Sequence, residues 1–285
     1  MTGEACALKC KHCNGLVLRG MVKVENPKKL FEVCEKFASK GYVGCLISGG
    51  CNKRGEVPLK PFINTIAKIK RELDMTVFVH TGLIDENLAF RLAEAEVDEA
   101  LIDIIGSNKT IKEVYNLNAT VEDYRHSLEA LTSAGIPIVP HVIVGLHYGR
   151  LLGEINALKI ISDFRPEALV IIALIPLKGT EMENVKPPEP EEIIRVICEA
   201  RKLMPDTLIS LGCMRPKGAH RSRTDKLAVK CGVNAMAFPT IEAIRTAEEL
   251  NLKVYYSSFC CSQILKDIKK LCKDFGKVIF WKSGD

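Results

Sequence analysis

The chain has 285 residues, of which 47% are hydrophobic and 26% charged, and its formal net charge is +5. This composition is typical of a globular protein with one large or two small domains, whose core needs no disulfides. The charge is mild, and no block of basic residues is interleaved with aromatic ones, so no nucleic-acid partner is expected. The longest apolar run, ALVIIALIP at 168–176, is too short to span a membrane.

Twelve cysteines are many for a chain of this kind. The first residues, MTGEACALKC, contain no apolar signal stretch. We therefore expect a cytoplasmic protein, in which clustered cysteines indicate metal or redox chemistry more often than disulfides.

Helical patterns alternate with short β-branched runs from about residue 27 onward. The predicted helices are 27–41, 58–73, 85–95, 121–134, 150–164, 189–203, 222–231 and 240–250, with a further amphipathic helix at the end of the chain. The predicted strands are 43–49, 76–82, 100–106, 136–146, 168–176, 207–213, 235–239 and 253–259. This order predicts an α/β fold with a parallel sheet, closed or nearly closed as a TIM-type barrel over residues 1–259. Residues 260–285 would form a helical tail.

Functional groups of such barrels lie at the carboxyl ends of the strands, on the loops that follow them. The residues that fall there are rich in Cys and His: Ser48 to Cys51, His80 to Gly82, Asp103, His141 to His147, Pro176 to Thr180, Cys213 to Arg215, and Cys260 with Cys261.

Three cysteines, Cys6, Cys10 and Cys13, have the spacing C-x3-C-x2-C. Zinc sites usually combine two C-x2-C pairs, and no second pair of this kind follows. An iron–sulfur cubane held by three thiolates keeps one iron open to a further ligand. An incidental or zinc-binding loop is the alternative.

This triad resembles the signature of the radical S-adenosylmethionine (SAM) superfamily, with His12 where an aromatic residue is usual. The resemblance extends to SGG (48–50), HVIVGLHYG (141–149) and IPLKGTEME (175–183). It implies that Cys6, Cys10 and Cys13 hold a [4Fe-4S] cluster whose open iron binds SAM. Ser48, Gly49 and Gly50 would then form a backbone ledge for the SAM amino group, since glycines allow close approach.

The resemblance also implies a strand before the cluster loop, yet only five residues precede Cys6. We expect either a barrel that is incomplete at its first strand or a partner that covers the gap.

The remaining cysteines divide into two classes. Cys34, Cys45, Cys198 and Cys231 occupy helix or strand positions that are typical of core residues. Cys51, Cys213, Cys260 and Cys261 follow strands and are candidate ligands of a second iron–sulfur cluster, as in the similar biotin synthases. Because adjacent cysteines point apart in extended chain, we expect only one of the last two to be a ligand.

Three further residues, His80, Asp103 and His141, are candidates for cofactor binding. Asp103 could hydrogen-bond a ribose hydroxyl of SAM, and the two histidines stand where biotin synthases place cysteines. Structural roles are the alternative: a buried His can be satisfied by a backbone carbonyl, and Asp103 can cap a strand end. Arg215 could bind a carboxylate in bidentate fashion or anchor an acidic residue of its loop.

The segments ALKCKHCNG, ISGGCNKRGEVPL and ISLGCMRPKG are similar to a biotin-synthase-like group from archaea and anaerobic bacteria. Members of that group form one half of a two-protein lipoyl synthase. This narrower resemblance implies sulfur insertion into an octanoyl group on a lipoyl-domain protein or peptide. The partners would be a second radical SAM protein and an electron donor such as ferredoxin. A metallocofactor maturase or another biotin-synthase-like enzyme, and a non-enzymatic metal-binding module, are the alternatives.

Overall fold

A computed structural model describes residues 1–257 and 260–268. The chain divides into two compact units. Unit 1 comprises Met1–Asp103, Asn108–Ile138 and Leu177–Glu181, and unit 2 comprises Ile104–Ser107, Val139–Pro176 and the described residues from Met182 onward.

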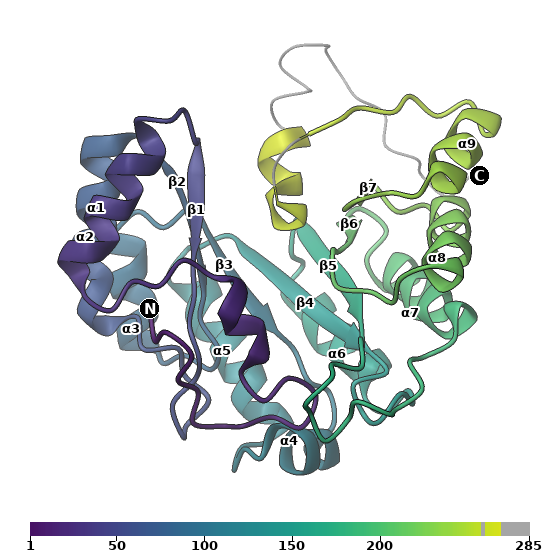
Figure 1. The fold of residues 1–285 in the computed structure, drawn as a ribbon, viewed down its shortest axis with the longest axis horizontal. Coiled ribbons are helices and arrows are strands. Elements are labelled where there is room, and N and C mark those ends of the chain that lie inside the picture. Colours follow the sequence, from purple (N-terminus) through teal and green to yellow (C-terminus); the bar gives the residue numbers. More distant parts are fainter. Residues whose placement is uncertain (258–259, 269–285) are drawn as a thin grey trace. The chain divides into compact units, whose positions relative to one another are not determined.

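Unit 1 is built around three parallel strands, β1 (Gly44–Ile47), β2 (Thr76–His80) and β3 (Glu99–Asp103). Its helices are η1 (Leu16–Gly20), α1 (Pro27–Ala38), η2 (Lys60–Phe62), α2 (Ile63–Leu73), α3 (Glu86–Glu94), α4 (Asn108–Tyr115) and α5 (Val121–Ser133). Helices α1, α2 and α3 lie along one face of the strands (Figure 1). The buried apolar residues of the strands and of these helices form the core of the unit.

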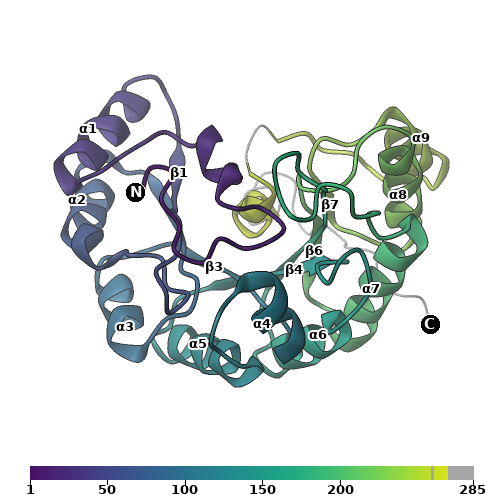
Figure 2. The same ribbon diagram turned by 60° about the horizontal axis from the view of Figure 1, so that its bottom comes forward.

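Unit 2 contains the parallel strands β4 (Ile138–Val144), β5 (Ala168–Ala173), β6 (Leu208–Leu211) and β7 (Ala235–Met236). Helices α6 (Glu154–Asp163), α7 (Pro190–Leu203), α8 (Ala219–Lys230) and α9 (Ile241–Glu249) follow the strands in turn. Figure 2 shows these helices side by side along the outside of the strands. A short helix, η3 (Cys261–Gln263), continues as α-helix over 264–268 and packs against β5 and β6.

The strands occur in the sheet in chain order, from β1 to β7. The predicted α/β fold with a parallel sheet of the TIM-barrel type is thereby confirmed. The described residues supply seven strands, whereas a complete TIM barrel has eight. The predicted domain boundary at 259/260 stays a prediction, since residues 258–259 and 269–285 lie outside the described part of the chain.

Several helices begin at residues whose side chains cap the free backbone N–H groups of the first turn. Asn26 accepts a hydrogen bond from the Lys29 N–H, and Pro27 occupies the first helical position of α1, where its missing N–H costs nothing. Asp85 does the same for α3 by accepting from the Leu88 N–H at 2.7 Å. These local signals explain why the helix starts could be predicted from the sequence.

Two sequence predictions differ from the structure. Residues 252–257 form no strand, so the described part of the predicted strand 253–259 is wrong; Tyr255 and Tyr256 are exposed there and offer no buried face. Helix α4 was not predicted, because only Thr110, Ile111 and Val114 of its largely polar sequence are buried.

Cysteine pairing was also missed by the sequence analysis. Cys198 of α7 and Cys231, just after α8, form a disulfide, although both were expected to be core thiols. Cys34 and Cys45 fit that expectation better, since their sulfur atoms lie 3.8 Å apart and Cys34 is fully buried.

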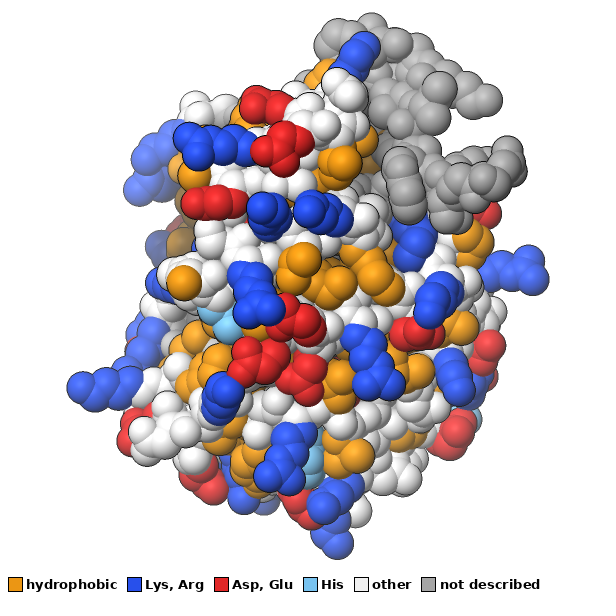
Figure 3. Space-filling view, turned by 90° about the vertical axis from the view of Figure 1, so that its right-hand side faces the viewer, with side chains coloured by type: hydrophobic (Ala, Val, Ile, Leu, Met, Phe, Trp, Pro, Cys, Tyr) orange, Lys and Arg blue, Asp and Glu red, His pale blue; other side chains and the backbone are white. Residues whose placement is uncertain are grey.

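The face of unit 2 that carries α7, α8 and α9 has basic and acidic side chains intermixed, with hydrophobic side chains between them (Figure 3). Among the described residues, no helix is both long and apolar enough to cross a membrane. The absence of a nucleic-acid partner stays a prediction.

The loop after β6 is held by a buried ion pair between Arg215 and Asp225 of α8. The Arg215 Nε donates to Asp225 Oδ1 at 2.7 Å and Nη2 donates to Oδ2 at 3.0 Å, and neither side chain is exposed. Arg215 also donates to the carbonyl of Gly212, while Asp225 accepts from the Thr240 N–H. The pair therefore ties the β6 loop, α8 and the start of α9 together.

Replacing Arg215 by Met should destabilise the protein by about 3–5 kcal/mol, because Asp225 would stay buried without its partner. The matched control is Arg223→Met on α8, because the exposed ion pair of Arg223 with Glu191 should contribute less than about 1 kcal/mol. Anaerobic denaturant unfolding measures both. Equal effects of the two changes would contradict the assignment, and Arg215→Met with Asp225→Leu should recover much of the loss.

Candidate functional site

The cysteine loop of unit 1 lies against the residues that follow β1. A Cβ atom on Gly50 would come within 2.2 Å of the Ala5 carbonyl oxygen and 2.6 Å of Cys6 Cβ. One residue further along each segment, the Ala7 N–H donates to the Cys51 carbonyl at 2.8 Å. Residue 50 must therefore be glycine for the loop to lie where it does.

Helix α4 holds the other side of the loop. The Lys11 N–H donates to the Val114 carbonyl at 2.8 Å, and Asn116 donates from Nδ2 to the carbonyls of Leu8 and Lys9. These contacts use backbone groups of the loop. One thiol takes part as well, since the Cys10 Sγ donates to the Tyr115 carbonyl across 3.7 Å.

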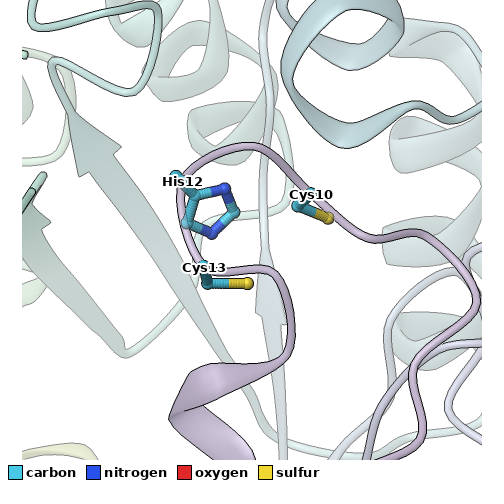
Figure 4. A group of neighbouring side chains, drawn as sticks. All are labelled: Cys10, His12 and Cys13. Carbon is cyan, nitrogen blue, oxygen red and sulfur yellow. The ribbon is translucent and has the colours of Figure 1, made fainter. Parts of the chain in front are cut away.

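Two of the triad thiols are close together and have a histidine beside them. One ligand atom from each of Cys10, His12 and Cys13 lies within 4.8 Å of the others. Figure 4 shows the three side chains on the loop. The His12 ring stacks at a tilt on Tyr115, with 5.3 Å between the centroids. A histidine thus fills the place where the sequence resemblance expects an aromatic residue.

Hydrogen bonding makes Cys13 the thiolate of the pair. The hydrogen bond from Cys10 and then the hydrogen bond and charge of His12 lower the pKa of Cys13 to about 4, although burial opposes the shift. The same bond to Cys13, together with burial, holds the pKa of Cys10 far above its ordinary value. Cys6 adds to that effect through its charge; it is not among the described side chains whose ligand atoms lie within 4.8 Å of one another, and its place in the cluster stays a prediction.

The donors present suit an iron–sulfur cluster. Thiolates are the ligands that such clusters take, and three of them leave one iron open. Within the described residues, the buried Nδ1 of His12 has no hydrogen-bond partner. A buried polar atom without a hydrogen-bond partner beside two thiols is consistent with a cluster that binds there in the holoprotein.

Two further predicted site residues of unit 1, His80 and Asp103, lie at the ends of β2 and β3. Their Nε2 and Oδ1 atoms are 3.8 Å apart, and each side chain is about a quarter exposed, at 25% and 27%. Burial alone would lower the pKa of His80, but the hydrogen bond and charge of Asp103 raise it above its ordinary value. The two residues form an accessible polar pair, and a role in binding SAM stays a prediction.

A cavity of about 400 Å³ adjoins the cysteine loop within unit 1. Its lining residues come from the loop, from the end of α4 and from the predicted PLKGT segment: Lys9, Cys10, Lys11, Asn14, Asn116, Gly179, Thr180 and Glu181. Lys11 and Glu181 form an ion pair across 3.4 Å. The structure thus places the PLKGT segment beside the triad, as the family resemblance implies.

A second group of thiols lies in unit 2. Cys213 follows β6, whereas Cys260 and Cys261 stand at the start of η3, and the Cys261 thiol hydrogen-bonds with both of the others. Because adjacent cysteines point apart in extended chain, the sequence predicts that only one of Cys260 and Cys261 is a cluster ligand; this stays a prediction, although the two thiols interact here. The chain turns from extended at Cys260 into the helix at Cys261, and this turn brings both sulfur atoms together.

Hydrogen bonding favours the thiolate form within this group. The hydrogen bond with Cys261 lowers the pKa of Cys213 to about 6 and that of Cys260 to about 5, and burial opposes both shifts; the single S–H of Cys261 can donate to only one of them at a time. Ser262 contributes further hydrogen bonds to Cys260. Arg221 donates to the Cys213 carbonyl at 3.3 Å, which fixes the backbone of Cys213.

His141 lies within β4 and not at its end. Its Nδ1 is 3.0 Å from the Val139 carbonyl, and its Nε2 is 3.4 Å from the hydroxyl of Ser262. His141 is therefore a neighbour of the tail thiols in unit 2, and its predicted role in cofactor binding stays a prediction. Arg215, the candidate in the loop after β6, forms an ion pair with Asp225, so it anchors an acidic residue of its own chain.

Comparison with known protein families identifies the superfamily of this chain. The profile of the radical SAM superfamily matches residues 1–149, which is more than half of the chain. The chain belongs to the radical SAM superfamily. Its cofactors are accordingly a [4Fe-4S] cluster and SAM. A second profile, the Biotin and Thiamin Synthesis associated domain, matches residues 170–272 of this radical SAM protein.

Curated relatives of this radical SAM protein include biotin synthases. That of Buchnera aphidicola subsp. Acyrthosiphon pisum is 26% identical over 249 residues, which cover 82% of this chain and 68% of the relative. That of Prochlorococcus marinus is 29% identical over 228 residues, covering 78% and 62%. The chain thus matches about two thirds of the length of these relatives.

Solved structures with the same fold include a methylornithine synthase, with a TM-score of 0.59 and 13% identity over 92% of this chain and 82% of that one. The [FeFe]-hydrogenase maturase from Carboxydothermus hydrogenoformans has a TM-score of 0.62 and 17% identity over 82% and 56%. At such low identity these likenesses concern the fold alone.

Replacing Gly50 by Ala should lower the iron content of the reconstituted protein, because the new methyl group overlaps Ala5 and Cys6 and must displace the loop. Gly20→Ala is the matched control, since nothing lies within 4 Å of a Cβ at Gly20. Iron and sulfide analysis together with SAM binding measures the effect. Wild-type iron in Gly50→Ala with weaker SAM binding would instead favour the ledge that the sequence predicts.

Replacing His12 by Phe should raise the pKa of Cys13, because the hydrogen bond and charge of His12 are lost while the ring that stacks on Tyr115 is kept. In metal-free protein, the pH midpoint for alkylation of Cys13, followed by mass spectrometry, should therefore move upward from about 4. His126→Phe, at an exposed position of α5, is the control and should not move it. An unchanged midpoint in His12→Phe would show that Cys10 alone sets this pKa.

Proposed function

We propose that this radical SAM enzyme inserts sulfur into an octanoyl group during the biosynthesis of the lipoyl cofactor, together with a second radical SAM protein. The observation that carries the proposal is the second group of thiols, Cys213, Cys260 and Cys261, which lies in unit 2 and shares no member with the triad. The sequence resemblance to the lipoyl synthase components and the relatedness to biotin synthases support it.

Sulfur insertion into a C–H bond requires two different sites. When bound, the first cluster and SAM supply a 5'-deoxyadenosyl radical, which can take hydrogen from an unactivated C–H bond. A sulfur source must then meet the new carbon radical. An iron–sulfur cluster held by the thiols of unit 2 would provide that sulfur, and the protein's own task is to hold, orient and shield the reactants.

The residues of unit 2 fit such a second cluster in kind and in number. Three thiols, with hydrogen bonding that favours the thiolate form, match the ligand type of iron–sulfur clusters. Ser262 and His141 stand next to them and could provide a further polar contact. Cys51, which the sequence analysis counted with this group, lies in unit 1, and its membership of a second cluster stays a prediction.

Biotin synthesis is the second candidate, and the relatedness to biotin synthases favours it. Three residues speak for a different activity. His80 and His141 stand where the resemblance expects cysteines, and Arg215 is fully engaged by Asp225 and Gly212.

For the lipoyl synthase reaction, the substrate is proposed to be an octanoylated lipoyl-domain protein or peptide, with ferredoxin or a similar protein as the electron donor.

Anaerobic reconstitution and iron analysis test the second cluster. Wild-type protein should hold about eight irons per chain, which is two cubanes, and a variant with Ser at positions 213, 260 and 261 should hold about four. This variant should still form 5'-deoxyadenosine but make no thiolated octanoyl product with the second radical SAM protein. A variant with Ala at all three triad positions should instead lose the formation of 5'-deoxyadenosine.

The product assay separates the candidates. An octanoylated lipoyl-domain peptide is incubated with both radical SAM proteins and followed by mass spectrometry for the gain of sulfur. Wild-type protein that holds about four irons, or that thiolates dethiobiotin and leaves the octanoyl peptide unchanged, would contradict the proposal.

A further inference from the structure

The residue that follows Gly50, Cys51, makes its backbone contacts with the triad loop, while its predicted role in a second cluster stays a prediction. Cys51 belongs to unit 1, and its carbonyl accepts the Ala7 N–H at 2.8 Å, one residue after Cys6. The preceding residue, Gly50, is in backbone contact with Cys6 itself. Cys51 thus stands beside the triad loop in the same unit.

The backbone on the far side of Cys51 is fixed as well. The Asn52 N–H donates to the Glu56 carbonyl at 2.9 Å, and the Asn52 side chain donates to the Glu56 carboxylate at 2.7 Å. A tight turn therefore begins directly after Cys51. With the cysteine loop on one side and this turn on the other, the residue has little freedom to move away.

The sulfur of Cys51 is also within electrostatic reach of the triad. The charges of Cys6 and Cys13 act on the thiol of Cys51, and Cys51 in turn acts on Cys10. Together with the backbone contacts of Gly50 and Cys51, this sets a fourth thiol beside the triad loop, and four is the number that fully ligates a cubane cluster.

We infer that Cys51 is an exchangeable fourth ligand, which binds the open iron when SAM is absent and leaves when SAM arrives. In the exchange, one iron–sulfur bond to Cys51 breaks and bonds from iron to the amino and carboxylate groups of SAM form. The thiolate departs with its electron pair and takes up the proton that the ammonium group of SAM loses on binding, so the protons balance and no electron is transferred. The inference rests on membership of the radical SAM superfamily and not on the identity of the acyl substrate.

Such a ligand would protect the cluster between turnovers. An iron that lacks a protein ligand is the one lost on mild oxidation, which leaves a [3Fe-4S] cluster with its own electron paramagnetic resonance signal. Closing the site with Cys51 prevents that loss, and SAM takes over the protection when it binds. Cys51 would also compete with SAM, which weakens the apparent affinity for SAM.

The test uses the full-length, anaerobically reconstituted protein and limited ferricyanide oxidation without SAM. Wild type should give little [3Fe-4S] signal, whereas Cys51→Ala and the better-fitting Cys51→Ser should give several-fold more. Added SAM should protect all three, and both variants should bind SAM more tightly than wild type. Cys45→Ser, a thiol of the same unit that contacts Cys34, is the control and should behave as wild type.

Three outcomes would overturn the inference. Equal signals from wild type and Cys51→Ala would show that the fourth iron is open. Wild-type behaviour of Cys51→Ser would show that packing, and not ligation, protects the cluster. Loss of about four irons in both Cys51 variants would place this thiol in the second cluster. The triad-alanine variant gives the background signal of the unit 2 thiols, so a failure of the proposed function can be recognised separately.

Discussion

The close contact between Gly50 and Cys6 is the constraint on which the cysteine loop depends. Because residue 50 has no side chain, the loop can lie directly on the chain that leaves β1, and hydrogen bonds between backbone groups then fix it. Val114 of α4 and the side chain of Asn116, the residue after α4, hold the opposite side. The loop is therefore positioned mainly through its backbone, with one thiol contact from Cys10 to the Tyr115 carbonyl, and a preorganised set of soft ligands is what a cluster site requires.

In unit 2, the loop and the helix that carry the thiols are also fixed by contacts with the surrounding chain. The β6 loop that carries Cys213 is fixed by Arg215, whose ion pair with Asp225 is completely buried, and by Arg221. The short helix η3 packs on β5 and β6 and carries Cys260 and Cys261 to the same place. The triad thus sits on a loop that backbone contacts fix, and the thiols of unit 2 sit at the end of β6 and at the start of η3; a second cluster there stays a proposal.

The functional residues that the sequence analysis missed are the supports of the site. His12 was treated as a departure from the usual aromatic residue, yet it hydrogen-bonds with Cys13 and stacks on Tyr115. Asn116 could not be identified, because α4 has too few buried residues to be recognised by periodicity. The interaction between the thiols of Cys260 and Cys261 was not foreseen either, because the rule that adjacent side chains point apart holds for extended chain and a helix begins at Cys261.

The sequence by itself determined the alternation of strands and helices, most helix ends, and the triad of Cys6, Cys10 and Cys13. These features are local: periodicity, capping residues and three cysteines within eight positions act over a few residues along the chain. Only the tertiary structure decided which of the other cysteines meet. Cys51 joined the triad loop, and Cys213 met the tail, because contacts between residues far apart in the chain depend on how the elements pack and not on their spacing.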